Sequence, residues 1–229
     1  MNIKHKKPTL TKKQRHRLRV QQVRRQKIFL TCLFLLIVGC ILLRFSKFSG
    51  RQKEAHQINA ACEAYRDEVS SEAAQYDMSD YVDLILAVMM QESSGQGTDP
   101  MQSSEGAYNT RYPQQPNGIT DPSYSISCGI QELKYALDKA GCTGPTDLSK
   151  IRLALQAYNF GADSYFAYLE ENGQTVWTAQ SAQAFAQMAS GGTQRDEDDP
   201  LHDPAGPWDY GDQYYPDHVL RYYHLDNNS

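Results

Sequence analysis

The chain has 229 residues and a formal net charge of −4, but this small value hides two segments of opposite charge. Residues 1–27 contain eleven Lys or Arg and no acidic residue, whereas residues 54–229 contain all 27 acidic residues and only eight Lys or Arg. The excess of carboxylates in the longer segment argues against non-specific nucleic-acid binding. A segment of about 175 residues is long enough for one domain with a substantial buried core.

An uncharged apolar run follows the basic segment, from Ile28 to Leu43, and Phe45 extends it. A spanning helix needs about 20 residues, and Arg44 can place its charge at the bilayer interface. A cationic flank before the run predicts a cytoplasmic N-terminus and an extracellular C-terminus, and this position also explains the basic charge without a nucleic-acid partner. We therefore expect a basic cytoplasmic segment at 1–27, a single-pass transmembrane anchor at 28–45, a linker at 46–54 and one catalytic domain at 55–229.

Two alternatives to a retained anchor stay open. A cleaved signal peptide requires a small-x-small site after the apolar run, but none follows, and the basic segment is long. A lipoprotein signal is the second alternative, because Ile37-Val-Gly-Cys40 resembles a lipobox. Cys40 is followed by apolar residues instead of a polar tether, so the uncleaved anchor is our prediction.

Three cysteines lie beyond the apolar run, at Cys62, Cys128 and Cys142. An odd number cannot pair completely within one chain, which leaves a Cys128–Cys142 bridge and buried free thiols as alternatives. No Cys/His spacing resembles a zinc site and no His-Glu-x-x-His motif occurs, so we expect neither a metal nor a cofactor.

The spacing of apolar residues predicts a mainly α domain. Helical spacing occurs near 55–76, 80–92, 130–140, 147–160, 162–171, 178–190 and 213–224. Residues 93–124 are rich in Gly, Pro, Ser, Asn and Gln, which is typical of a binding loop or a small hairpin. The Asp-rich segment within 191–212 matches no calcium-loop template, and we interpret it as a solvated turn.

Glu92 ends the second of these helices on an apolar face. Ile85, Val88 and Met89 precede it by seven, four and three residues, which places the carboxylate on the side that packs into a core. Burial there disfavours the charged form, so the pKa should rise, as a general acid near neutral pH requires. Gly95 ends the helix and places the acid where a cleft can open. The alternative is a solvated residue in the last helical turn.

Three short motifs occur in a fixed order: Glu92-Ser-Ser-Gly95, Gly129-Ile-Gln131 and Ala157-Tyr-Asn-x-Gly161. Together they resemble the lysozyme-like superfamily, which holds goose-type lysozymes and soluble lytic transglycosylases. With the string Asp99-Pro-Met-Gln-Ser-Ser-Glu105, the chain is most similar to the muramidase domain of CwlT-type cell-wall hydrolases from Gram-positive bacteria and their conjugative elements. The resemblance runs from residue 55 to the C-terminus and implies a lysozyme-like helical fold.

The resemblance implies cleavage of the MurNAc-β-1,4-GlcNAc bond of peptidoglycan, with Glu92 as the general acid. Two alternatives are a lytic transglycosylase that forms 1,6-anhydroMurNAc ends and a catalytically silent glycan-binding or conjugation-complex scaffold. Inverting hydrolysis needs a second carboxylate about 6.5–9.5 Å from the acid. Asp99 and Glu105 are preferred over Asp121 and Glu132 because they lie in the family-like string, although each has the alternative role of holding the loop.

The substrate-binding residues are likewise implied by the resemblance. Tyr158 and Asn159 match the family's Tyr-Asn, and Tyr215 matches a C-terminal Tyr-x-x-x-Val-Leu segment. Core packing for the two tyrosines and a helix cap for Asn159 are the structural alternatives.

Two further residues have weaker matches. Gln131 corresponds to the glutamine of the family's Gly-Leu-Met-Gln, with Glu132 as the alternative in a shifted register. Ser127, or alternatively Ser125, corresponds to a serine that orients the acid. The expected partners are peptidoglycan strands and a conjugation, secretion or cell-wall complex.

Overall fold

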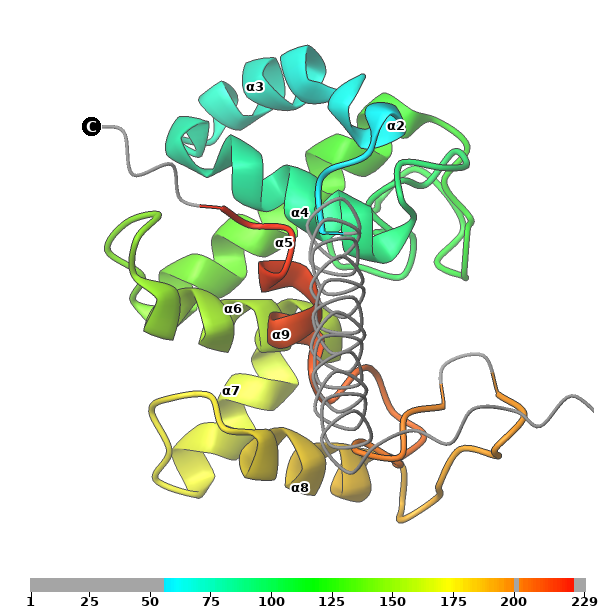
Figure 1. Cartoon of the computed structure of the whole chain (residues 1–229), viewed down its shortest axis with the longest axis vertical. Helices are drawn as coiled ribbons and strands as arrows, with labels where there is room; N and C mark the ends of the chain where they lie inside the picture. Colours follow the sequence, from blue (N-terminus) through cyan, green and yellow to red (C-terminus); the bar gives the residue numbers. More distant parts are fainter. Residues whose placement is uncertain (1–55, 200–201, 225–229) are drawn as a thin grey trace, which may run out of the picture. The chain divides into compact units, whose positions relative to one another are not determined.

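A computed structural model describes residues 56–199 and 202–224 (Figure 1). Over these residues the chain is helical, and its only β-type pairing is an isolated bridge between Gln194 and Trp208. The mainly α prediction is therefore confirmed. The elements are α2 (Ala60–Glu63), α3 (Arg66–Gln75), a 3₁₀ turn (Ser79–Tyr81), α4 (Val82–Glu92), α5 (Pro122–Ala140), α6 (Leu148–Phe160), α7 (Ala162–Glu171), α8 (Ala179–Ala189) and α9 (Tyr215–Leu220).

The predicted basic segment, transmembrane anchor and linker lie outside the described residues. Among the helices at 56–199 and 202–224, none has the length and hydropathy needed to cross a membrane.

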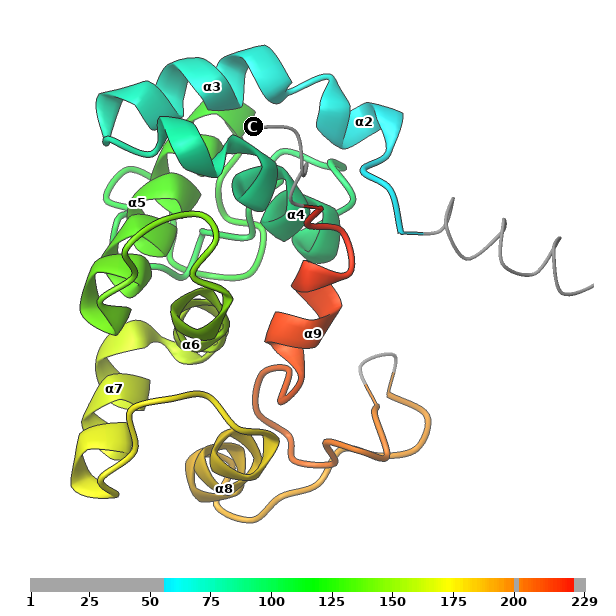
Figure 2. The same cartoon turned by 60° about the vertical axis from the view of Figure 1, so that its left-hand side comes forward.

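Helix α4 lies in the core of the domain. Its residues from Leu84 to Met89 are all buried, and α3 and α9 pack against it. Helix α6 packs against α5, α7 and α9. Because α9 also packs against α4, it links α4 to α6. Two views show α3 at one end of the domain and α7 with α8 at the other (Figures 1 and 2). The short helix α9 packs against both α6 and α4.

The end of α4 is fixed by a tight turn. Ser93 donates a hydrogen bond from Oγ to the carbonyl of Pro100 at 2.8 Å. Gly95 has a φ of +72°, and a Cβ there would lie 2.7 Å from the backbone nitrogen of Cys62 in α2. A side chain at this position would therefore be strained and would also collide with α2. The helix ends at Glu92 as the sequence predicts, and the chain then turns back against the N-terminal helices.

Helix α5 begins eight residues earlier than the sequence analysis predicted. Its first residue is Pro122, and the side chain of Asp121 accepts a hydrogen bond from the backbone N–H of Ser123 at 3.2 Å. An Asp cap followed by Pro at the first helical position is a strong start signal, which the Ser-rich sequence after it obscured. The predicted loop at 93–124 is thus shorter, and Ser127 and Gln131 lie on a helix.

The predicted helix at 55–76 is also interrupted. The structure divides it into α2 and α3, with a turn at Ala64 and Tyr65 between them. The three cysteines of the domain are free thiols, of which Cys62 and Cys128 are buried. The alternative of unpaired cysteines is therefore confirmed over the Cys128–Cys142 bridge.

Candidate active site

Glu92 lines a cavity of about 690 Å³. The walls come from the end of α4, the loop that follows it, the end of α6, the segment at 195–213 and α9. These elements are far apart in the sequence, and the packing of α9 on α4 and α6 brings them together. Polar and charged side chains dominate the lining, which includes Gln102, Glu105, Asn159, Arg195, Asp212, Tyr215, His218 and Arg221.

The Glu92 carboxyl group lies in an environment that raises its pKa toward neutral pH. Its side chain is half-buried, and Oε1 accepts a hydrogen bond from the hydroxyl of Tyr215. Burial raises the pKa of Glu92 to about 7, and the negative charges of Asp212 and Asp99 add to the rise. The Tyr215 hydrogen bond opposes the rise because it stabilises the ionised form, but burial dominates. The raised pKa agrees with the expectation from the helical spacing of Glu92.

Tyr158 packs on the tyrosine that contacts Glu92, and Asn159 lines the same cavity as Glu92. The Tyr158 ring stacks on the Tyr215 ring with centroids 6.3 Å apart, and its hydroxyl donates to the carbonyl of Met101 at 2.9 Å. Asn159 lines the cavity, and its Oδ1 accepts from the backbone N–H of Asp212 at 2.7 Å. Both residues therefore hold the cavity walls together.

Asp99 is buried, and its carboxylate is occupied by the loop. Oδ1 accepts hydrogen bonds from the backbone N–H of Ser103 at 3.0 Å and from the hydroxyl of Ser125 at 2.6 Å. Oδ2 accepts from the backbone N–H and the hydroxyl of Ser104. With an exposed fraction of only 1%, this carboxylate fastens residues 99–104 to the first turn of α5. These contacts favour the loop-holding role for Asp99.

Two carboxylates face the cavity more openly. Glu105 is exposed and lines the same cavity as Glu92. Asp212 was not singled out from the sequence. It bonds to Nδ1 of His218 at 2.5 Å and accepts from the backbone N–H of Tyr214 at 2.8 Å. The hydrogen bond that His218 donates to the Asp212 carboxylate raises the pKa of His218.

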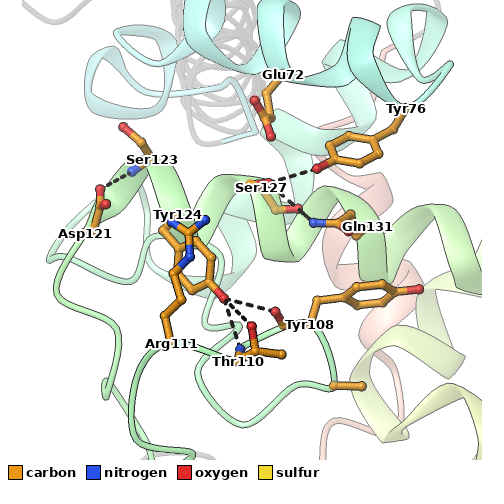
Figure 3. Close-up of a pocket in the computed structure, with 11 residues that line it drawn as sticks. Glu72, Tyr76, Tyr108, Thr110, Arg111, Asp121, Ser123, Tyr124, Ser127 and Gln131 are labelled. Carbon is orange, nitrogen blue, oxygen red and sulfur yellow. Dashed lines mark hydrogen bonds between the residues drawn. The ribbon is translucent and has the colours of Figure 1, made fainter.

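Ser127 and Gln131 do not lie in this cavity. They line a second cavity of about 570 Å³ between α3, α5 and residues 107–111 (Figure 3). Gln102 lines the Glu92 cavity instead. The sequence signal for Gln102 was present, because Met101-Gln102 preserves the Met-Gln of the family motif in the string that follows Glu92. The role of Ser127 in orienting the acid and the substrate-binding role of Gln131 stay predictions, although both residues line a different cavity from Glu92.

Glu132, the alternative to Gln131, lies beneath the loop between the two cavities. A Cβ on Gly106 would lie 1.4 Å from its Oε1, so any side chain at this position would require the Glu132 carboxyl group to move. Oε1 is buried without a hydrogen-bond partner among the described residues. Burial raises the pKa of Glu132 to about 7, against a hydrogen bond from the backbone of Tyr108. The carboxyl group is thus neutral over much of the acidic pH range. At 56–199 and 202–224, no three His, Cys, Asp or Glu side chains are grouped so that they could hold a metal ion.

A helical domain with a glutamate of raised pKa at a helix end, facing a polar cavity, is the arrangement expected of a lysozyme-like protein. The family model described as Lysozyme-like matches residues 60–223. The chain belongs to the lysozyme-like family.

Several proteins are similar to this chain. The bifunctional muramidase/DL-endopeptidase CwlT of Bacillus subtilis (strain 168) is 36% identical over 173 residues, which cover 76% of this chain and 43% of CwlT. The uncharacterized membrane protein YocA of the same strain is 40% identical over 111 residues, or 48% of this chain and 45% of YocA. A pneumococcal vaccine antigen A homolog of Streptococcus pyogenes serotype M1 is 37% identical over 110 residues, or 48% of this chain and 50% of that protein. The chain thus spans about half the length of the curated relatives it matches.

One solved structure is also similar, that of a protein described as similar to lipoprotein, of the NLP/P60 family, from Staphylococcus aureus subsp. aureus Mu50. The TM-score is 0.61 with 28% sequence identity, over 76% of this chain and 56% of that one.

Proposed function

We propose that this protein is a membrane-anchored peptidoglycan hydrolase that cleaves the MurNAc-β-1,4-GlcNAc bond, with Glu92 as its general acid. The observation that supports this most is the environment of Glu92, which has a pKa of about 7 and faces a polar cavity in a lysozyme-like domain. A relative that covers three quarters of the chain is named a muramidase. The family, the acid and the cavity together support glycosidic cleavage.

In the proposed reaction, neutral Glu92 donates its proton to the oxygen of the glycosidic bond as that bond breaks. The glutamate becomes anionic in this step, and the Tyr215 hydroxyl already donates to the oxygen Oε1. This hydrogen bond strengthens as negative charge develops, so it stabilises the transition state more than the starting state. The nearby carboxylate of Asp212 favours the positive charge that develops on the sugar ring.

Hydrolysis also needs a group that activates water on the other face of the sugar. Glu105 is the predicted catalytic carboxylate that lines the cavity, and Asp212 is a further carboxylate in its lining. Asp99, the other predicted catalytic residue, has both oxygens occupied by hydrogen bonds from the loop. We propose that Asp99 acts through this loop, by holding Gln102 at the cavity.

We further propose that residues 28–45 anchor the protein in the cell membrane with the domain outside the cell. The proposal rests on the basic flank before the apolar run. Protease added to intact protoplasts should remove the chain after about residue 50, where the anchor and linker end. Protection of the domain would contradict this topology. Membership of a conjugation or secretion complex is compatible with it.

Mass spectrometry of the products from purified sacculi, digested by the full-length protein in detergent, tests the proposed activity. A muramidase releases muropeptides with reducing MurNAc ends. Products with 1,6-anhydroMurNAc ends would show the alternative, a lytic transglycosylase. Release of no product by a folded protein would contradict both and support a glycan-binding or scaffold module.

A further inference from the structure

A second polar cavity lies between α3, α5 and the loop at 107–111, and we call it the α3–α5 pocket (Figure 3). Its volume of about 570 Å³ lies in the range that encloses small ligands. The proposed glycosidase reaction uses none of its lining residues. The residues that matter for its chemistry are Glu72, Tyr76, Arg111, Asp121, Tyr124 and Gln131.

Hydrogen bonds within the chain hold the wall of the pocket in place. The Tyr124 hydroxyl accepts a hydrogen bond from the backbone N–H of Thr110 at 3.0 Å and donates to the carbonyl of Tyr108 at 3.1 Å. These two bonds fasten the loop to α5. The Arg111 guanidinium lies over the Tyr124 ring, 4.5 Å from its centroid. A stacked guanidinium keeps its N–H groups free at the edge and loses less freedom when it binds a carboxylate.

The charged side chains of the pocket do not form ion pairs with each other. Glu72 and Asp121 line the same cavity as Arg111, but none of the ion pairs among the described residues involves the Arg111 guanidinium. Glu72 accepts a hydrogen bond from Gln75, and Asp121 caps α5, so neither carboxylate has a cation partner. Separated charges of both signs in one pocket fit a ligand that itself carries a carboxylate and an ammonium group.

Neutral hydrogen-bonding groups lie between these charges. Gln131 donates from Nε2 to the carbonyl of Ser127 at 3.1 Å, which leaves its side-chain oxygen available to a ligand N–H. The Tyr76 hydroxyl lies 3.2 Å from Oγ of Ser127, and its ring forms part of the wall. Figure 3 shows Gln131 between the rings of Tyr76 and Tyr108. The side-chain oxygen of Gln131 can accept a hydrogen bond from the N–H of a peptide bond, and the two rings can pack against the flat face of that bond.

We propose that the α3–α5 pocket binds a short zwitterionic peptide, namely the peptide stem of peptidoglycan. An uncross-linked stem has free carboxylates, which match Arg111, and a free ammonium group on its diamino acid, which matches Glu72 or Asp121. The identity of the peptide rests on the proposed function. The pocket then selects glycan strands by their peptides, while the Glu92 cavity holds the sugars.

The positions of the two cavities support this division. Glu105 lines the Glu92 cavity and Ala107 lines the α3–α5 pocket. Their Cα atoms are separated by one residue, Gly106, and therefore lie at most about 7.6 Å apart. Gly106 in turn packs on the buried carboxyl group of Glu132. One substrate that has both sugars and peptides can therefore reach both sides of this loop.

Calorimetry with the full-length protein in detergent micelles tests peptide binding directly. The probe is the N-acetylated peptide L-Ala-γ-D-Glu-L-Lys-D-Ala-D-Ala. Wild-type protein should bind it, and Arg111→Gln should weaken binding by at least about tenfold, the usual effect of losing a charge-assisted hydrogen bond. Glu72→Gln should weaken it as well. Lys134→Gln removes an exposed α5 cation paired with Asp138, outside the pocket, and should leave binding unchanged.

Three results of this titration would overturn the proposal: absence of peptide binding by the wild type, equal binding by Arg111→Gln, or weakening by Lys134→Gln to the same extent. Chitotetraose, a saccharide without peptide, is the comparison ligand. If it bound the wild type and Arg111→Gln weakened that binding, the pocket would be a sugar site instead of a peptide site.

Cleavage assays separate this proposal from the proposed function. Wild type should cleave peptide-bearing glycan strands faster than strands stripped of their stems by an amidase, and Arg111→Gln should lose that preference without losing cleavage of stripped strands. Equal rates on both substrates for the wild type would overturn the proposal. Absence of any cleavage would overturn the proposed function, while the calorimetric result would still decide what the pocket binds.

Discussion

The hydroxyl of Tyr215 donates a hydrogen bond to Oε1 of Glu92, which joins the start of α9 to the end of α4. The two residues are 123 positions apart in the sequence. Tyr215 is buried, with an exposed fraction of 1%, and its ring stacks on Tyr158. The proposed acid is therefore held by a tyrosine whose position depends on the folding of the whole domain.

Tyr215→Phe should move the pH dependence of cleavage to higher pH. The substitution keeps the ring but removes the hydrogen bond that stabilises ionised Glu92, so the pKa of Glu92 should rise above about 7. The alkaline limb of the pH–rate profile should follow it. The maximal rate should fall by about tenfold, because the anion formed in the reaction loses its donor. Profiles of kcat/KM between pH 5 and 9 measure both effects.

The matched control is Tyr165→Phe, which removes the hydroxyl of another buried tyrosine, in the aromatic cluster of α6, α7 and α8. This variant should keep the wild-type profile. An unchanged alkaline limb in Tyr215→Phe would mean that the hydrogen bond does not tune the acid.

Glu92→Gln should stabilise the fold more as the pH rises. The folded pKa of about 7 exceeds the ordinary pKa of 4.5 of a glutamate side chain, so between these values the folded state binds more protons than the unfolded state. The stability of the wild type therefore falls as pH rises through this window, and the penalty is complete above about pH 7. A glutamine has no such penalty. Because the side chain is half-buried, we expect a gain of about 1–3 kcal/mol at pH 8 and little difference at pH 4.

Urea unfolding of both proteins at pH 4, 6 and 8 measures this difference. Glu132, whose pKa is also about 7, is present in both proteins, but the charge of Glu92 contributes to that raised pKa, so the comparison measures Glu92 together with this coupling. Equal stability at every pH would show that Glu92 is solvated, even if it proved to be catalytic.

The sequence was sufficient to predict the parts of the site that depend on local helical order. Glu92 was placed at the end of α4 by the apolar spacing before it and by Gly95 after it, and Tyr158-Asn159 was placed at the end of α6 by the same kind of pattern. Local periodicity predicts which face a side chain occupies. Tyr215 was assigned to the site only by family resemblance, and its hydrogen bond to Glu92 was not predicted, because periodicity contains no information about residues 123 positions apart.

The sequence was not sufficient for the loop after Glu92 and the start of α5. Gln131 was matched to the motif glutamine because Gly129 and Ile130 precede it, but α5 begins at Pro122 and turns Gln131 toward α3. Asp212 and His218 gave no signal at all. Their pairing is local, because they are six residues apart, but the packing of α9 on α4 and α6 places the pair at the cavity, and no spacing in that Tyr-rich segment indicates this packing.

A pair of glutamine variants tests which glutamine contributes to cleavage in the Glu92 cavity. Gln102 lines the Glu92 cavity and is exposed, so Gln102→Ala should lower kcat/KM on peptide-stripped glycan strands by roughly tenfold, the cost of one lost hydrogen bond of about 1.5 kcal/mol. Gln131→Ala, in the other cavity, should leave that value unchanged. The opposite order of effects would restore Gln131 as the motif residue.

Asp99→Asn should destabilise the loop and lower activity through it. The carboxylate accepts hydrogen bonds from two backbone N–H groups and two hydroxyls at an exposed fraction of 1%, and an amide NH₂ would face some of these donors. We expect a loss of about 2–4 kcal/mol in the free energy of unfolding. Glu171→Gln, an exposed acid at the end of α7, is the control. Loss of cleavage at unchanged stability would instead show that Asp99 takes part in the chemistry.

The most direct test of the proposed function is the rate at which Glu92→Gln releases muropeptides from purified sacculi. Glutamine keeps the shape of the side chain and cannot donate the required proton, so the rate should fall by at least about 10²-fold, the usual contribution of a general acid. Thermal melting should show that the variant is folded and no less stable than the wild type. Release at a near wild-type rate by this folded variant would contradict the assignment of Glu92 as the acid.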